Sequence, residues 1–223
     1  LDQKAFAKLM QEQKVRAREA RKALGDLAWA GIDLGLDNTP TKFVGYEQNA
    51  CSAKVLAVCV GDEVSGSIAG GEDGIIVLDQ TPFYAEMGGQ VADHGIISMG
   101  DCCFQVNNVQ KDKGSKYLHH GKMVKGSLKV DDVVTASIDV ERRKAIMRAH
   151  SATHLLQKAL STVLGDHVHQ AGSLVEPDYL RFDFTHYSAL TQEELARVNA
   201  IVQDSILEGY NIDIKEMPID EAK

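Results

Sequence analysis

The sequence predicts an α+β protein in which an N-terminal helix leads into an antiparallel β-barrel and then into a mixed layer of helices and strands. Three observations predict this order. Residues 2–24 contain no glycine or proline, short β-rich runs fill the middle of the chain, and a helix, strand, strand, helix, strand pattern follows. We therefore divide the chain into a helical end at 1–30, a linker at 31–48, a barrel at 49–141 and an α+β part at 142–223.

Composition narrows the class of protein. With 223 residues, 25% of them charged and 44% hydrophobic, the chain is an ordinary globular sequence that can bury a core. Its net charge of −8 disfavours a general nucleic-acid coat, so any RNA contact requires a local basic patch. No apolar run is long enough to span a bilayer and no signal peptide is evident, so we expect a cytoplasmic protein without a membrane partner.

The four cysteines predict free thiols in a reducing compartment, because none has paired C-x-x-C spacing. They are Cys51, Cys59, Cys102 and Cys103.

The first predicted helix covers residues 2–24 and ends at Gly25. It carries a basic cluster that either contacts RNA or forms a solvated helix face, and the sequence leaves both open. The cluster consists of Lys14, Arg16, Arg18, Arg21 and Lys22. Glycine, proline and polar residues between 31 and 42 indicate a linker.

Five β-rich runs separated by turn residues predict the barrel. They are Ala53–Val60, Gly74–Leu78, Gly95–Ser98, Cys102–Val109 and Val133–Val140.

The α+β part begins with a helix from about Arg142 to Leu164, which Gly165 ends. Two strands are then predicted at Val168–Val175 and Leu180–Phe184, the second with strictly alternating polarity. A capping box opens a further helix that runs through Leu207 and ends at Gly209, and Asn211–Met217 resembles a last strand. The capping box is Thr191 with Glu194.

His150 and His154 stand four residues apart on the first of these helices, so both imidazoles project from one side and can hold a single zinc ion. The apolar stripe of this helix falls on roughly the opposite side, which separates the pair from ordinary core histidines. The alternative is a merely polar helix face. Further ligands within the chain would be His167 and His169, which we place on one face of the following strand.

Several common enzyme signatures are absent from the sequence. Ser151 occupies the position where the H-E-x-x-H zinc peptidases need a glutamate base. There is also no P-loop, no Rossmann glycine fingerprint and no G-x-S-x-G elbow, so nucleotide-binding and serine-hydrolase functions lack support.

Gly88 and Gly89 form a second candidate feature, since two glycines let the backbone approach a ligand with no side chain between them. A hairpin corner of the barrel explains the same residues equally simply.

Four blocks of sequence together resemble the alanyl-tRNA synthetase family. They are Thr81–Gln90 (TPFYAEMGGQ), His150–His154 (HSATH), Gln170–Val175 (QAGSLV) and Leu180–Phe184 (LRFDF). The resemblance covers essentially the whole chain. It implies the end of a helical tRNA-binding region, a translation-factor-like barrel and the first part of the editing domain that threonyl- and alanyl-tRNA synthetases share.

In that family the editing domain hydrolyses serine or glycine from mischarged tRNA(Ala), because a pocket sized for alanine excludes neither well. The resemblance implies a zinc pair of His150 and His154, catalytic roles for Thr153 and Gln170, and substrate contacts by Gly88, Gly89 and Arg181. It also implies the acceptor end of tRNA(Ala) and the remainder of the synthetase as partners. ATP and magnesium would belong to a ligase core outside this chain.

One departure from the family pattern shapes the expected activity. The family completes its zinc site with a C-x-x-x-H pair, and here every cysteine precedes the histidines. We therefore expect half a ligand set, weak or no zinc binding and a catalytically silent piece of a longer protein. Unpaired strand edges in such a piece would favour a homodimer. The alternatives are a self-sufficient zinc hydrolase with a local third ligand and a non-catalytic RNA-binding module.

Overall fold

The structure, a computed structural model, describes residues 34–61, 63–211, 217–218 and 220–221. The predicted N-terminal helix and its basic cluster lie outside the described residues, as does nearly all of the predicted strand 211–217. The chain forms two compact units. One contains Leu1–Met87 and Ala92–Arg143, and the other contains Gly88–Val91 and Lys144–Lys223.

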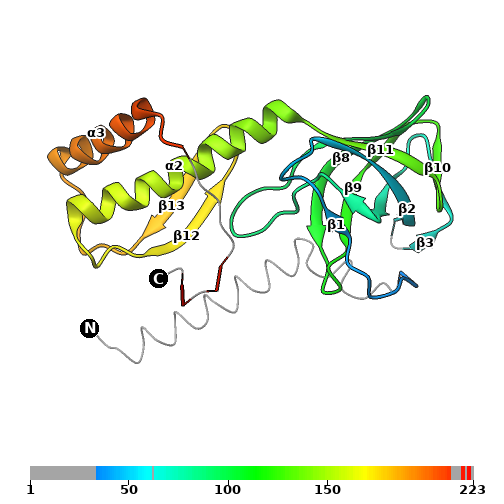
Figure 1. The fold of residues 1–223 in the computed structure, drawn as a ribbon, viewed down its shortest axis with the longest axis horizontal. Helices are drawn as coiled ribbons and strands as arrows, with labels where there is room; N and C mark the ends of the chain where they lie inside the picture. Colours follow the sequence, from blue (N-terminus) through cyan, green and yellow to red (C-terminus); the bar gives the residue numbers. More distant parts are fainter. Residues whose placement is uncertain (1–33, 62, 212–216, 219, 222–223) are drawn as a thin grey trace. The chain divides into compact units, whose positions relative to one another are not determined.

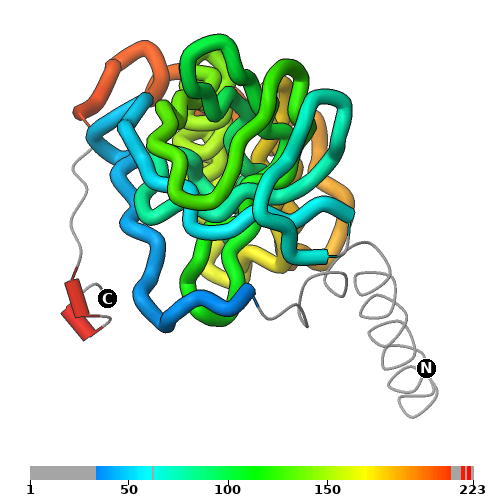
Figure 2. The backbone as a smooth tube through the Cα atoms, turned by 90° about the vertical axis from the view of Figure 1, so that its right-hand side faces the viewer, coloured from blue at the N-terminus to red at the C-terminus, as the bar shows by residue number. Residues whose placement is uncertain are grey.

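The first unit is a closed antiparallel barrel, as the sequence predicts (Figure 1). Six strands follow one another around it, and the last pairs back with the first. In ring order they are β2 (Ala50–Val60), β5 (Asp73–Leu78), β9 (Tyr117–Lys125), β8 (Cys102–Lys111), β7 (Gly95–Met99) and β11 (Val133–Ile138). Figure 2 shows the same strands, blue to green, as a backbone tube.

Short strands extend this barrel at its margins. β3 (Glu63–Ser65) continues the sheet beyond β2, and β4 (Ser67–Ala69) pairs with β10 (Ser127–Lys129). β1 (Lys42–Phe43) runs parallel to β6 (Gln80–Thr81), so part of the segment 31–48 joins the barrel unit.

The barrel core follows from alternation along its strands. In β8, Phe104 and Val106 are buried while Gln105 and Asn107 are not, because successive side chains point to opposite faces. Phe83 and Met123 complete the largest buried cluster, and each such side chain contributes about 1.5–3 kcal/mol through burial. All four cysteines are free thiols.

Strand β9 is the barrel strand that the sequence pattern did not predict, because it contains two histidines and a glycine among its apolar residues. His119 is nevertheless fully buried. Its Nδ1–H donates to the carbonyl oxygen of Ile76 (2.8 Å), and its Nε2 accepts from the hydroxyl of Thr81 (2.7 Å). Burial lowers the pKa of His119 to about 4. Both nitrogens are thus satisfied by the neutral ring, and His119 is a structural residue.

A buried ion pair fixes the start of the long helix α2 (Val140–Leu164) to the barrel unit. The Arg143 Nε lies 2.9 and 3.1 Å from the two carboxylate oxygens of Asp93, and its Nη2 contacts the same carboxylate. The guanidinium also donates to the carbonyl oxygens of Gly45 (2.7 Å) and Pro82 (3.0 Å). Asp93 in turn accepts from the backbone N–H of Tyr84 (2.7 Å), so every group of the pair has a partner that compensates its burial.

The second unit places α2 and α3 (Gln192–Glu208) with an antiparallel pair, β12 (Gln170–Val175) and β13 (Leu180–Phe184). Its core contains Ala159 and Leu160 of α2 together with Val168 and Val198. These elements confirm the α+β prediction for this part of the chain.

The ends of the helices also agree with the sequence. Thr191 and Glu194 form the reciprocal capping box, and Gly209 ends α3 in the left-handed conformation (φ 63°). The strand after α2 begins at Gln170 rather than Val168, however. His167 and His169 therefore lie in the turn before β12, and their predicted placement on one strand face is wrong.

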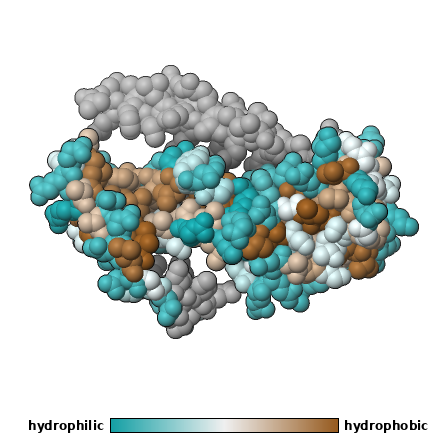
Figure 3. Space-filling model, turned by 90° about the horizontal axis from the view of Figure 1, so that it is seen from above, coloured by the Kyte–Doolittle hydropathy of each residue, from teal (hydrophilic) through white to brown (hydrophobic). Residues whose placement is uncertain are grey.

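Apolar side chains are also found on the surface of both units. Figure 3 shows, on one face, brown apolar patches bordered by teal polar ones. The described part of the chain contains no helix whose length and hydropathy would let it cross a membrane.

Candidate functional site

The double-glycine segment leaves the barrel unit and joins the sheet of the second unit. Gln90 forms a parallel bridge with Val175, the last residue of β12. The N–H of Val175 donates to the Gly89 carbonyl (2.8 Å), and the Val91 N–H donates to the Val175 carbonyl (3.1 Å). Gly88 and Gly89 form a turn, and Gln90 directly after it makes an isolated bridge to β12, so the segment pairs with the second unit.

Glycine is required at position 89 for a steric reason. Its φ is +88°, and a Cβ built on it would lie 2.4 Å from the carbonyl oxygen of Ser173. Gly88 also has a positive φ (+63°), but a Cβ there would meet no atom within 4 Å. At Gly89 the absence of a side chain is thus required for the close pairing with β12. At Gly88 glycine is favoured only by the left-handed backbone conformation.

Gly89→Ala is expected to release the segment from β12, whereas Gly88→Ala leaves it in place. We expect Gly89→Ala to cost about 2 kcal/mol, because backbone strain adds to a backbone clash. Gly88→Ala, the matched control, should cost about 1 kcal/mol through its left-handed conformation alone. Hydrogen exchange of the Val175 and Val91 amides measures the difference. Equal protection of these amides in the two variants would contradict the steric argument.

His150 is held by this segment. Its Nδ1 lies 2.6 Å from the side-chain carbonyl oxygen of Gln90, and because that oxygen only accepts, Nδ1 carries the hydrogen. Burial lowers the pKa of His150, and the neighbouring His154 lowers it further. The ring is thus held neutral, with its Nε2 lone pair available, which is the form that ligates a metal.

The two histidines form a pair, as their spacing predicts. Their rings are stacked with centroids 5.2 Å apart and planes 22° from parallel. Two imidazoles from adjacent helical turns, one of them oriented by an amide oxygen, fit two positions of a zinc site.

Within the ranges that the structure describes, no group of three or more His, Cys, Asp or Glu side chains is placed to hold a metal ion. His167 is engaged elsewhere, with Nε2 at 2.9 Å from Nδ1 of His186 and its ring stacked on Tyr187 (4.6 Å). The backbone N–H of His169 donates to the hydroxyl of Thr185 (3.0 Å). The structure therefore offers no support for a local third ligand from these two residues.

The other predicted site residues are distributed along the same unit. Thr153 is buried on α2, and its hydroxyl donates to the Ala149 carbonyl (2.9 Å). Gln170 is exposed at the opposite end of β12 from Val175, about 16 Å away by the rise of an extended strand. Arg181 is exposed and pairs with Asp183 (3.2 Å). Of the predicted residues, Gly88 and Gly89 directly precede Gln90, which contacts His150, whereas Gln170 and Arg181 lie on β12 and β13.

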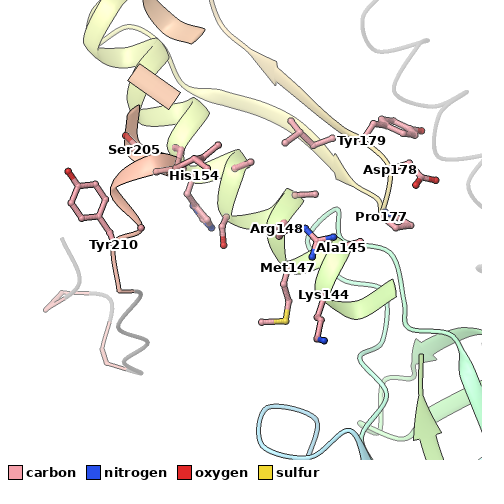
Figure 4. A pocket seen from close by; sticks show the side chains of 17 residues that line it. Lys144, Ala145, Met147, Arg148, His154, Pro177, Asp178, Tyr179, Ser205 and Tyr210 are labelled. Atoms are coloured by element: carbon pink, nitrogen blue, oxygen red, sulfur yellow. The ribbon is translucent and has the colours of Figure 1, made fainter. Parts of the chain in front are cut away.

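A pocket of about 960 Å³ lies beside His154 (Figure 4). His154 is the one predicted site residue in its lining. Two basic side chains, Lys144 and Arg148, line it from α2, and two tyrosines, Tyr179 and Tyr210, line it from the β12–β13 turn and the end of α3. Cations and aromatic rings suit a nucleic-acid end, through phosphate contacts and base stacking. Lys144 and Arg148 are four residues apart on α2, but Tyr179 and Tyr210 lie far from them along the chain, so no local pattern joins the four residues.

Comparison with known proteins assigns the family. The model of the class II (A) tRNA synthetases matches residues 1–142, which is more than half of the sequence. The chain belongs to the class II (A) tRNA synthetases. This synthetase chain is 46% identical to the alanine–tRNA ligase of Acetivibrio thermocellus over 226 residues, which cover all of the chain and 26% of that relative.

Two other relatives give the same picture. The alanine–tRNA ligase 1 of Lachnoclostridium phytofermentans is 44% identical over 225 residues, and the alanine–tRNA ligase of Thermoanaerobacter sp. (strain X514) is 43% identical over 222. The synthetase chain is fully covered in both, and spans about a quarter of the length of the curated relatives it matches (26% and 25%). These matches confirm the family resemblance read from the sequence blocks.

Proposed function

We propose that the second unit is the first part of an editing domain that hydrolyses serine or glycine from mischarged tRNA(Ala), within an alanine–tRNA ligase. The single observation that carries the proposal is the pair of His150 and His154, in which His150 is oriented by Gln90 of the double-glycine segment. The names of the relatives support the ligase as the parent activity. In this proposal the barrel is translation-factor-like and the compartment is the cytoplasm.

His150 and His154 would hold the zinc ion, which when bound supplies a polarised ester carbonyl and an acidified water. Gln90 keeps Nε2 of His150 free for that role. The Thr153 hydroxyl already donates to the Ala149 carbonyl, so it is left as an acceptor. It can therefore accept from the hydroxyl of a seryl group, which alanine lacks.

The remaining residues would contact the tRNA acceptor end. Lys144 and Arg148 attract its phosphates at the pocket beside His154. Gln170 and Arg181 would contact the substrate from the exposed sides of β12 and β13. The rest of the zinc ligands, and the ligase core that uses ATP and magnesium, would come from the remainder of the synthetase.

A chimeric synthetase tests the proposal. This chain would replace the matching 26% of the Acetivibrio thermocellus alanine–tRNA ligase, to which it is 46% identical. The chimera should release serine from Ser-tRNA(Ala), and His150→Ala should lower this rate by about 100-fold or more while alanylation persists. Serine release at the unchanged rate in the His150→Ala chimera would overturn the proposal.

The isolated chain should be nearly silent in the same assay, because two ligands hold zinc weakly. Stoichiometric zinc after dialysis, together with serine release that His150→Ala abolishes, would instead establish the self-sufficient hydrolase. Steeply salt-dependent tRNA binding with no dependence on His150 would favour the RNA-binding module.

A further inference from the structure

We propose that Gln90 is a positioning residue, which fixes His150 in the tautomer with hydrogen on Nδ1 and so presents Nε2 to a divalent cation. The inference deepens the proposed function and rests on it for the identity of the cation site. Its direct evidence is the 2.6 Å contact between Nδ1 of His150 and the side-chain oxygen of Gln90.

Gln90 can act in this way because its own backbone is fixed on both sides. The residue before it accepts a hydrogen bond from Val175, and the residue after it donates one to the same Val175. Gly89 also packs against Ser173 so closely that no side chain fits there. A half-buried amide on such a segment has little freedom, so its oxygen defines a direction for the His150 ring.

The hydrogen bond decides which nitrogen of His150 is available. A neutral imidazole has one N–H and one lone pair, and a bond from one nitrogen settles the role of the other. An unrestrained ring populates both tautomers and rotates about its side-chain torsions. Removing an orienting partner of a metal-bound histidine typically weakens the metal by 10- to 100-fold. Gln90 would therefore raise the affinity of His150 for the cation without contacting the cation itself.

Three variants of the chain separate positioning from folding. Gln90→Met removes the acceptor at similar volume, and Gln90→Glu keeps an acceptor at the same place. Gln203→Met, on the exposed surface of α3, is the matched control. Each backbone bond to Val175 is independent of the side chain at 90, so the Val175 and Val91 amides report that the pairing is intact.

Two measurements are made on each protein. Long-range ¹H–¹⁵N spectra of the metal-free chain give the tautomer of His150, with His154 as reference. We expect hydrogen on Nδ1 in the wild type, a mixed tautomer in Gln90→Met and recovery in Gln90→Glu. Titration with Zn²⁺, followed by the shifts of both histidines, should show affinity about 10- to 100-fold weaker for Gln90→Met and unchanged for Gln203→Met.

The outcomes distinguish this inference from the proposed function. A wild-type His150 with hydrogen on Nε2, or a tautomer and zinc affinity unaffected by Gln90→Met, would overturn the role of Gln90 even if zinc binds. A Gln90-dependent tautomer without zinc binding at millimolar concentration would uphold the orientation of the ring. It would overturn cation binding by His150 and His154 of this chain alone, whereas the zinc pair of the proposed function is tested separately by serine release in the chimeric synthetase.

Discussion

Replacing Asp93 with alanine is expected to destabilise the barrel unit by about 3–5 kcal/mol, the largest effect we expect from a single substitution. The carboxylate is almost fully buried, and its removal leaves the Arg143 guanidinium without its counter-charge. The bonds from Arg143 to the Gly45 and Pro82 carbonyls cannot compensate for that charge. Urea unfolding of the purified variant measures the loss.

An exposed ion pair provides the control for this substitution. Lys54→Met removes the partner of Asp131 in a short contact (2.8 Å) whose two side chains are both exposed, and it leaves the left-handed backbone of Asp131 (φ 73°) unchanged. It should therefore cost less than about 1 kcal/mol. Similar losses of stability in Asp93→Ala and Lys54→Met would show that burial does not make the Asp93–Arg143 pair more important than an exposed pair.

Acid is expected to destabilise the barrel through His119, by about 3 kcal/mol between pH 7 and pH 4. In the folded protein its pKa is about 4, because the ring is fully buried, whereas the unfolded chain keeps the ordinary value of 6.5. Between these two values the unfolded state binds more protons than the folded one. Stability due to His119 is therefore complete above about pH 6.5 and is progressively lost as the pH falls towards 4.

The variant His119→Gln isolates this contribution, because glutamine retains a donor and an acceptor but does not titrate. Urea unfolding of both proteins at a series of pH values gives the difference. The variant should be less stable at pH 7, and the gap between the two proteins should narrow by about 3 kcal/mol at pH 4. Parallel stability curves would show that His119 is already protonated in the fold, or solvated.

Local chemistry predicted much of this structure from the sequence. The helix ends at Gly165 and Gly209 and the capping box at Thr191 depend on a few neighbouring residues, so they could be read directly. Alternation likewise identified β13 to the residue. Strand β9 was missed because His119 looks polar in sequence, and only its two partners from β5 and β6 explain its burial.

The histidine pair of the candidate site could be predicted from the sequence, but the contact that orients His150 could not. The four-residue spacing of His150 and His154 places them on one helix side whatever surrounds them. Gln90 is 60 residues from His150, and no local pattern indicates that its segment leaves the barrel to pair with β12. His167 was considered as a ligand because its distant partner His186 was unknown.

The excursion of four residues from the barrel sequence into the second unit makes that unit discontinuous along the chain. A polypeptide beginning at Ala92 would contain both histidines of α2 yet would lack the amide that orients one of them. During synthesis, Gln90 leaves the ribosome long before His150. The backbone bonds that fix its position can form only after Val175 has also been synthesised. Each unit is therefore encoded by two separated stretches of the gene, and neither unit can be transferred to another protein as one uninterrupted stretch.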